Sequence, residues 1–145
     1  MLQQKLGDQC IIVRIPQIWG KDCPRLLKLR EDTKSNTLIM TYPNFYVNYT
    51  TNIQIAEWIE YILKKDLRGI FHIGTQDTCD YMQFQSELSR ILGLKQPLFI
   101  KEAVLQKCFQ AVLPGREEIP KSFQMKVMDV LAYLGYSQRE RVESI

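Results

Sequence analysis

The chain has 145 residues, of which 46% are hydrophobic and 24% charged, a composition typical of a single globular domain. The formal net charge is +3, and because the Lys and Arg residues are scattered along the chain, no nucleic-acid partner is expected. No apolar run approaches the ~20 residues that span a bilayer, so no membrane partner is expected either.

The first residues have the pattern of a helix end. Leu2 and Leu6 are spaced for one helix face, and Gly7-Asp8 is a stop signal. Residues 1–9 are therefore predicted to be the end of a truncated helix, whose beginning the chain does not contain.

The stretch CIIVRIPQIWG contains the first predicted strand, Cys10–Ile15. Its unbroken apolar run, bounded by Pro16, is typical of a parallel strand that is covered on both faces. In α/β sheets, small molecules bind beyond the carboxyl ends of the strands. The turn from Pro16 to Gly20 is therefore a candidate site.

A basic helix and two short strands are predicted next. Pro24 is a helix-start signal for a helix over 24–34. Its basic residues are interpreted as a solvated face, with the alternative that one or two lie near an anionic ligand. These residues are Lys21, Arg25, Lys28, Arg30 and Lys34. The runs 37–42 and 45–47 are predicted to be peripheral strands.

Residues 50–92 have a helix, strand, helix pattern. Thr50 or Thr51 is a natural N-cap for an amphipathic helix that ends near Lys65. A second apolar strand is predicted over Gly69–Gly74, and a helix over 81–92. Together with the first strand, this order is the rhythm of a parallel βαβ sheet.

The pattern is weaker beyond Pro97. The predicted elements are, in order, a strand over Leu98–Ile100, a helix over Glu102–Val112, a loop over Leu113–Pro120, a helix over Ser122–Leu134 that ends at Gly135, and a polar tail over 136–145.

Few residues have the spacing that catalysis or metal binding needs. His72 is the only histidine, and inside an apolar strand it is interpreted as a structural residue. The four cysteines form no C-x-x-C pair, which favours free thiols in a cytoplasmic protein over disulfides or a zinc site. No glycine-rich loop of the dinucleotide or Walker type occurs.

Three stretches resemble, in their order and spacing, the C-terminal half of the extended short-chain dehydrogenases/reductases, and most of all the dTDP-4-dehydrorhamnose reductase group. The stretches are IIVRIPQIWG, VNYTTNIQIAEWIEYIL and GIFHIGTQDTCDYMQFQSELSRILGL. The residues that fill the family's positions are Arg14, Trp19-Gly20, Thr50, Ile55-Ala56, Gly69–Gly74 and Leu92-Gly93. The resemblance covers the chain from Leu2 to Gly135.

This resemblance implies an α/β fold class: the C-terminal fragment of a Rossmann-type enzyme, with few parallel strands and a small helical substrate-binding subdomain. Residues 1–145 would then form a single C-terminal substrate-binding region. In the family, a glycine-rich nucleotide loop and a Tyr-x-x-x-Lys pair precede the I-V-R strand, and neither precedes it in this chain. NAD or NADP is therefore implied as the cofactor of the full-length parent, with no tight binding to this chain.

The resemblance also implies roles for particular residues. Ile15 and Pro16 would lie against the nicotinamide. The residues implied to contact the sugar nucleotide are Gln17, Asn48 and Thr50. The family's Pro before the Thr is Tyr49 here, and an Arg that related epimerases have before this helix is missing. No residue of this chain is expected to be catalytic.

Two functions follow as hypotheses. The leading one is the substrate-binding portion of an NAD(P)-dependent sugar-nucleotide reductase or epimerase, inactive on its own. The alternative is a non-catalytic, reductase-like module that binds a protein partner. Under either hypothesis, the strands over 10–15 and 69–74 would have unpaired edges, so self-association, as in a swapped dimer, is expected.

Overall fold

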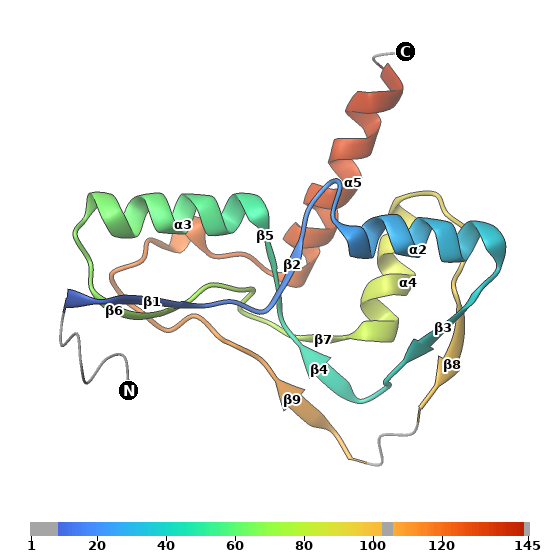
Figure 1. The fold of residues 1–145 in the computed structure, drawn as a ribbon, viewed down its shortest axis with the longest axis horizontal. Coiled ribbons are helices and arrows are strands. Elements are labelled where there is room, and N and C mark those ends of the chain that lie inside the picture. The colour runs from blue at the N-terminus through green and yellow to red at the C-terminus, as the bar shows by residue number, and fades with distance from the viewer. Residues whose placement is uncertain (1–8, 103–105, 144–145) are drawn as a thin grey trace.

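The computed structural model describes residues 9–102 and 106–143, and for 137–143 only the backbone. Helices and short strands alternate along an elongated molecule (Figure 1). The helices are α2 (Pro24–Ser35), α3 (Asn52–Lys64), α4 (Tyr81–Ile91) and α5 (Val127–Glu143), with a 3-10 turn at Lys121–Phe123. The strands are β1 (Ile11–Arg14), β2 (Gln17–Trp19), β3 (Leu38–Thr41), β4 (Phe45–Val47), β5 (Tyr49–Thr51), β6 (Gly69–His72), β7 (Cys79–Asp80), β8 (Leu98–Lys101) and β9 (Cys108–Gln110).

The strands form small sheets in which parallel pairing predominates. β1 pairs with β6, β2 with β5 and β3 with β8, all in parallel. β4 lies between β7, which is antiparallel to it, and β9, which is parallel. The run 45–47 is thus the middle strand of its own sheet, whereas the sequence had suggested a peripheral one.

The β1–β6 pair confirms the predicted parallel unit. Ile11 aligns with Gly69 and Arg14 with His72, and the crossover between β5 and β6 is α3. One face of this pair packs against α3 in a core formed by Trp58, Ile62, Phe71, Ile73 and Ile119. The strand is not covered on both faces as predicted, because its apolar residues are only half-buried.

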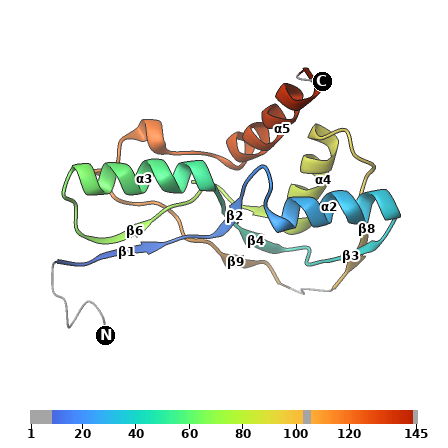
Figure 2. The same cartoon turned by 45° about the horizontal axis from the view of Figure 1, so that its top comes forward.

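A second core lies under α2, α4 and α5, at the other end of the molecule (Figures 1 and 2). Its centre is aromatic: the rings of Tyr49 and Phe84 stack with centroids 4.0 Å apart, and Trp19 lies 5.0 Å from Phe84. Burial raises the pKa of the Tyr49 hydroxyl, which donates a hydrogen bond to the Cys79 carbonyl at 3.1 Å. Such a ring supplies apolar area while its polar tip stays satisfied.

The helix starts follow local signals in the sequence. The Thr51 side chain accepts from the Gln54 amide at 3.0 Å and caps α3, and Asp80 caps α4 in the same way at 2.9 Å. α2 begins with Pro24 and is followed by the cap residue Asn36, whose φ of 54° is left-handed. These caps satisfy backbone groups that a helix end leaves without partners.

Three predicted elements are wrong. The turn over 16–20 contains β2, which pairs with β5. The predicted helix over 102–112 is in its described part the strand β9, where Phe109 stacks on Tyr46 at 5.1 Å. Gly135 does not end the last helix, which begins at Val127 and continues to Glu143, so the backbone of most of the predicted tail is helical.

Two further predictions meet the limits of the description. The helix end predicted over 1–9 lies, except for its last residue, outside the described residues. Cys10, Cys23, Cys79 and Cys108 form no disulfide with one another. Within the described ranges, no helix has both the length and the apolar character that crossing a membrane requires, and no cluster of metal-ligating side chains occurs.

Candidate functional site

A cavity of about 530 Å³ lies among α2, α4 and the strands β2, β3 and β4. Aromatic rings form much of its wall, and they come from four different segments: Trp19, Tyr42, Phe45 and Tyr81. Phe45 and Tyr81 are parallel, with centroids 6.3 Å apart. Its volume is in the range that small-molecule sites have, and flat rings are surfaces on which a planar group can stack.

Three polar atoms of this wall are buried and have no hydrogen-bond partner within the described residues. They are Oε1 of Gln17, Nε1 of Trp19 and Oε1 of Gln85. A buried polar atom without a partner costs free energy, and native proteins have few of them. Because the three atoms are buried, a ligand in the cavity would bond to them only after the side chains around them move.

Charged side chains lie along one side of the cavity, on α2. Lys28 Nζ pairs with Asp32 Oδ2 at 2.9 Å, and the Asp32 side chain is only 10% exposed. Arg25 also lines the cavity and forms no ion pair in the described part of the chain. Burial raises the pKa of Tyr81, and the positive charge of Arg25 opposes that rise, which places this cation near the ring. Arg25 is thus available to an anionic group.

Gln17 is the one predicted site residue that lines this cavity. β2 positions it, one strand residue before Ile18 and two before Trp19. Ile15 is 40% exposed in the link between β1 and β2. Its apolar side chain beside Pro16 offers a surface of the kind that a nicotinamide contacts. The role of Ile15 and Pro16 in cofactor binding stays a prediction.

Asn48 and Pro16 meet at Gly74. The Asn48 amide donates to the carbonyls of Thr75 at 3.1 Å and Val112 at 2.8 Å, and it accepts from the Val112 amide at 2.9 Å. A Cβ at Gly74 would collide with the Asn48 amide and lie 3.0 Å from the Pro16 ring. Asn48 therefore connects three segments of the chain.

Thr50 is fully buried in β5, and its hydroxyl donates to Gln54 Oε1 at 2.7 Å. The observed partners of Asn48 and Thr50 are all protein groups. Their predicted contact with a sugar nucleotide stays a prediction.

Sequence reasoning missed most of the cavity wall. Five basic residues were interpreted from the sequence as a solvated face, with the alternative that one or two lie near an anionic ligand, and two of the five, Arg25 and Lys28, line the cavity. No sequence signal pointed to Tyr81 and Gln85 as cavity residues. They are four residues apart on α4, a spacing that is typical of any half-buried helix face.

One Tyr-x-x-x-Lys spacing does occur in the chain, at Tyr61 and Lys65. It follows the I-V-R strand, whereas the family's pair precedes it. The Tyr61 hydroxyl donates to the Glu118 carbonyl at 3.3 Å, and Lys65 Nζ lies 6.0 Å from the centre of the same ring. Tyr61 thus connects the end of α3 to the loop over 113–120, and neither Tyr61 nor Lys65 lines the cavity.

His72 lies in β6, as predicted, and contacts the chain through Nδ1, which is 3.2 Å from the Leu113 carbonyl. Burial and nearby acidic groups raise the pKa of the Cys79 thiol to about 12. A thiol held in its neutral form is a poor nucleophile.

Comparison with known proteins bears on the fold. No protein-family model matches the sequence, and no curated protein matches it. Among solved structures, the dTDP-4-dehydrorhamnose reductase of Bacillus anthracis in complex with NADP matches with a TM-score of 0.75 at 15% identity, over 92% of this chain and 50% of that one. The UDP-N-acetylglucosamine 4-epimerase of Methanobrevibacter ruminantium, in complex with UDP-N-acetylmuramic acid, matches with 0.67 at 12% identity, over 99% and 49%.

A further match is the UDP-N-acetylglucosamine 4-epimerase of Bacillus cereus, with a TM-score of 0.64 at 11% identity, over 94% of this chain and 49% of that one. The chain thus spans about half the length of the structures that it matches. At these identities the likeness concerns the fold alone. The predicted resemblance is confirmed at that level: the chain is a partial Rossmann-like α/β fold, similar to half of a dTDP-4-dehydrorhamnose reductase or of a UDP-N-acetylglucosamine 4-epimerase.

Proposed function

We propose that this chain is the sugar-nucleotide-binding portion of an NAD(P)-dependent reductase or epimerase. The observation that carries the proposal is the cavity, whose lining combines aromatic rings, the Arg25 cation and three residues with buried polar atoms that have no partner in the described part of the chain. These groups suit the parts of a sugar nucleotide: a flat base, neutral hydroxyl and amide groups, and a diphosphate.

The proposal includes inactivity of this chain on its own. No glycine-rich phosphate loop occurs in its sequence, and no Tyr-x-x-x-Lys pair precedes β1. A reduced nicotinamide would supply hydride in a full-length enzyme. Here the apolar side chains of Ile15 and Pro16 would give that cofactor one wall, so tight binding of NAD or NADP is not expected. Four cysteines that form no disulfide support a cytoplasmic location.

The direct test is to titrate the chain with a dTDP-sugar, a UDP-sugar and NADP and to measure binding by calorimetry. A separate assay measures NADPH oxidation. We expect weak, millimolar-range binding of a sugar nucleotide and no turnover. Reductase activity of this chain alone would contradict the proposal.

A variant ties the binding to the cavity. Gln85→Met replaces a buried amide, whose oxygen has no partner, with an apolar side chain of similar size. We expect sugar-nucleotide affinity to fall by about tenfold while stability stays equal or rises, because a buried unsatisfied group is removed. Gln83→Met is the matched control, since Gln83 lies exposed on the same helix. Equal losses of affinity in both variants would argue against this cavity.

The alternative function is a non-catalytic module that binds a protein partner. One observation favours it: Leu38, Met40, Leu98 and Ile100 are all about half-exposed, and their register places them on one face of the β3–β8 pair. Apolar patches of this kind often mark interaction surfaces. Two results together would favour the module. The wild-type chain would capture a protein partner and bind no sugar nucleotide, and Met40→Lys or Ile100→Lys would abolish the capture.

A further inference from the structure

The free edge of β3 borders the cavity of about 530 Å³. Ile39 and Met40 both line this cavity, although successive side chains of a strand point to opposite faces. Ile39 packs against the core under α2 and α4, whereas Met40 is 58% exposed. A space that both residues line therefore lies along an edge of the strand. β8 occupies the other edge, and among the described residues none of β8 lines the cavity.

The register of β3 shows which backbone groups point to the free edge. β3 and β8 run parallel, side by side (Figure 1). The Glu102 amide donates to the Thr41 carbonyl at 2.9 Å, so the backbone groups of Ile39 and Thr41 face β8. Because these groups alternate along a strand, the amides and carbonyls of Leu38 and Met40 point away from β8.

The Met40 amide and carbonyl have no hydrogen-bond partner in the part of the chain that the structure describes. Both groups of one residue point the same way, so they match a ligand that has an amide group on each side of one carbon atom, as every residue of a peptide has. A single amide group directs its donor and its acceptor in opposite directions and could bond to only one of them. Addition of a peptide strand to an open sheet edge is a common mode of recognition.

The two faces of this edge differ in polarity. Leu38 and Met40 are exposed on one face, and the apolar surface continues across β8 through Leu98 and Ile100. A ligand residue opposite Met40 would share this apolar face, because cross-strand neighbours lie on the same side of a sheet. The ligand residues before and after it would point to the cavity side, where Arg25 lines the wall and forms no ion pair among the described residues. An acidic side chain suits that position.

We propose that the free edge of β3 is a docking site for an extended segment of a protein partner, in which an apolar residue lies between two acidic ones. The segment adds to β3 as an antiparallel strand, and its apolar residue exchanges both backbone hydrogen bonds with Met40. An acidic neighbour pairs with Arg25. This docking mode does not rest on sugar-nucleotide binding, although both ligands would use the same cavity.

The test is a titration of the isotope-labelled, full 145-residue chain with the capped peptide acetyl-Thr-Glu-Val-Glu-Thr-amide, followed by two-dimensional NMR. We expect the amide signal of Met40 to move downfield, as the signal of an amide does when it gains a hydrogen bond. No shift of this signal at millimolar peptide would overturn the proposal. A shift that appears without peptide, when the concentration of the chain is raised, would mean that a second copy takes the edge and would overturn it as well.

Two methylated forms of the peptide test for strand pairing. N-methylation of the valine removes the donor that faces Met40, whereas N-methylation of the second glutamate removes a donor that points away from β3. The first change should weaken binding by about tenfold, and the second should leave it unchanged. Equal effects would show that side chains alone hold the peptide, and would overturn the proposal.

Variants of the chain test the same contact from the other side. Met40→Pro removes the outward amide without removing a bond to β8, so it should weaken binding by about tenfold. Met40→Ala is its control, because it shortens the side chain but keeps the amide, and it should weaken binding less. Arg25→Gln should weaken binding more than Arg90→Gln, which removes an exposed cation of α4 that pairs with Glu87. Equal losses within either pair of variants would contradict the docking mode.

The peptide is titrated in the absence of sugar nucleotide. Failure of the peptide to bind therefore leaves the proposed sugar-nucleotide function standing, and failure of a sugar nucleotide to bind leaves the β3 docking site standing.

Discussion

Gln17 and Asn48 are both strand-end amides that the sequence singled out, and the structure gives them different surroundings. All the donors of Asn48 are used within the chain, at 2.8 and 3.1 Å. The Gln17 oxygen is buried and has no partner within the described residues, and Gln17 itself lines the cavity. A sequence shows that an amide is present but not which atoms lie within 3 Å of it, so single site residues could not be ranked from sequence.

Glu118 has a shifted titration that predicts a pH effect on stability. The hydrogen bonds from Arg116 lower the pKa of its carboxyl from 4.5 to about 2 in the folded chain. A lowered folded pKa stabilises the fold above the unfolded value, and this contribution is lost as the pH falls from 4.5 towards 2. Removing the carboxylate by Glu118→Gln should therefore shift the urea midpoint more at about pH 5 than at about pH 3.

Arg116→Gln supplies the control for this prediction. Without the guanidinium, the Glu118→Gln change should shift the urea midpoint equally at both pH values. A pH-dependent shift that persists without Arg116 would show that another group is responsible.

At the scale of elements, helices were predicted better than strands. α3 begins after Thr51, one of its two predicted caps, and α4 begins at residue 81, as predicted. Both starts have a local signal, because Thr51 and Asp80 each cap an amide three residues further along the chain. β2 and β9 have three residues each, too few to show a periodicity. They exist because distant segments, β5 and β4, pair with them. Long-range pairing of this kind leaves no local signal.

Gly135 illustrates the same limit within a helix. It was predicted to end a helix, yet α5 continues through it. A side chain at this position would collide with Cγ2 of Ile91 on α4, which explains why the residue is glycine. The glycine thus allows two helices to pack closely. In an exposed helix interior, alanine is more stabilising than glycine by about 1 kcal/mol. Forcing an extra methyl group into a packed contact costs about 1–3 kcal/mol, which is the larger effect.

Gly135→Ala should therefore destabilise the chain, as measured by urea unfolding, although it raises helix propensity. In the background of Ile91→Ala, which removes the colliding methyl, the same substitution should become neutral or stabilising. This reversal of sign is a coupling that a double-mutant cycle measures directly. Destabilisation in both backgrounds would mean that the crossing of α4 and α5 is not what requires glycine.

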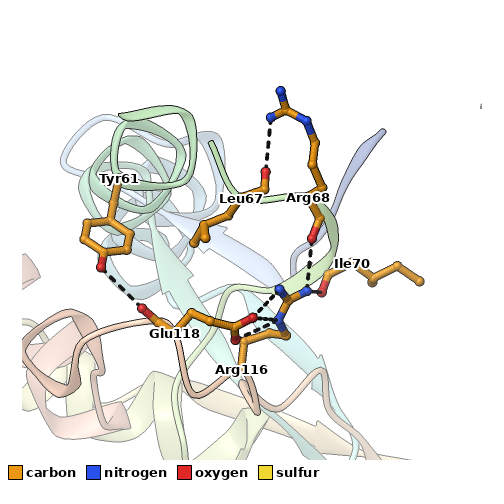
Figure 3. A network of polar contacts seen from close by, with 6 residues as sticks. All are labelled: Tyr61, Leu67, Arg68, Ile70, Arg116 and Glu118. Carbon is orange, nitrogen blue, oxygen red and sulfur yellow. Dashed lines mark hydrogen bonds and ion pairs between the residues drawn. The ribbon is translucent and has the colours of Figure 1, made fainter. Parts of the chain in front are cut away.

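For the whole molecule, the strand–helix order was enough to predict a parallel α/β fold, and the resemblance of three stretches to a known family predicted that this fold is half of a reductase-like one. They did not predict that the two edges of the β1–β6 pair differ. The segment over 112–118 contacts the outer side of β6, through His72 with Leu113 and through Arg116 with the Arg68 and Ile70 carbonyls (Figure 3). β1 has no strand partner besides β6 in the described ranges. Self-association is therefore proposed at β1.

The backbone of β1 shows which amides face that edge. The Gly69 amide donates to the Cys10 carbonyl at 2.9 Å, and the Ile73 amide donates to the Arg14 carbonyl at 3.0 Å. Backbone groups alternate along a strand, so residues 10, 12 and 14 face β6, while Ile11 and Val13 face outwards. Outward amides on an edge strand are the groups with which a second chain pairs.

Proline at position 11 would remove one outward amide without removing a hydrogen bond to β6. We expect Ile11→Pro to shift the chain from dimer to monomer in light scattering across a concentration series. Ile11→Ala loses the same packing against the α3 core but keeps the amide, so it should still self-associate. Ile12→Pro removes an inward amide and should lower stability instead. Ile11→Ala and Ile11→Pro differ in the backbone donor, so equal dissociation of the two variants would mean that the β1 edge is not the contact. A wild-type chain that is a monomer at every concentration would exclude the β1 contact as well.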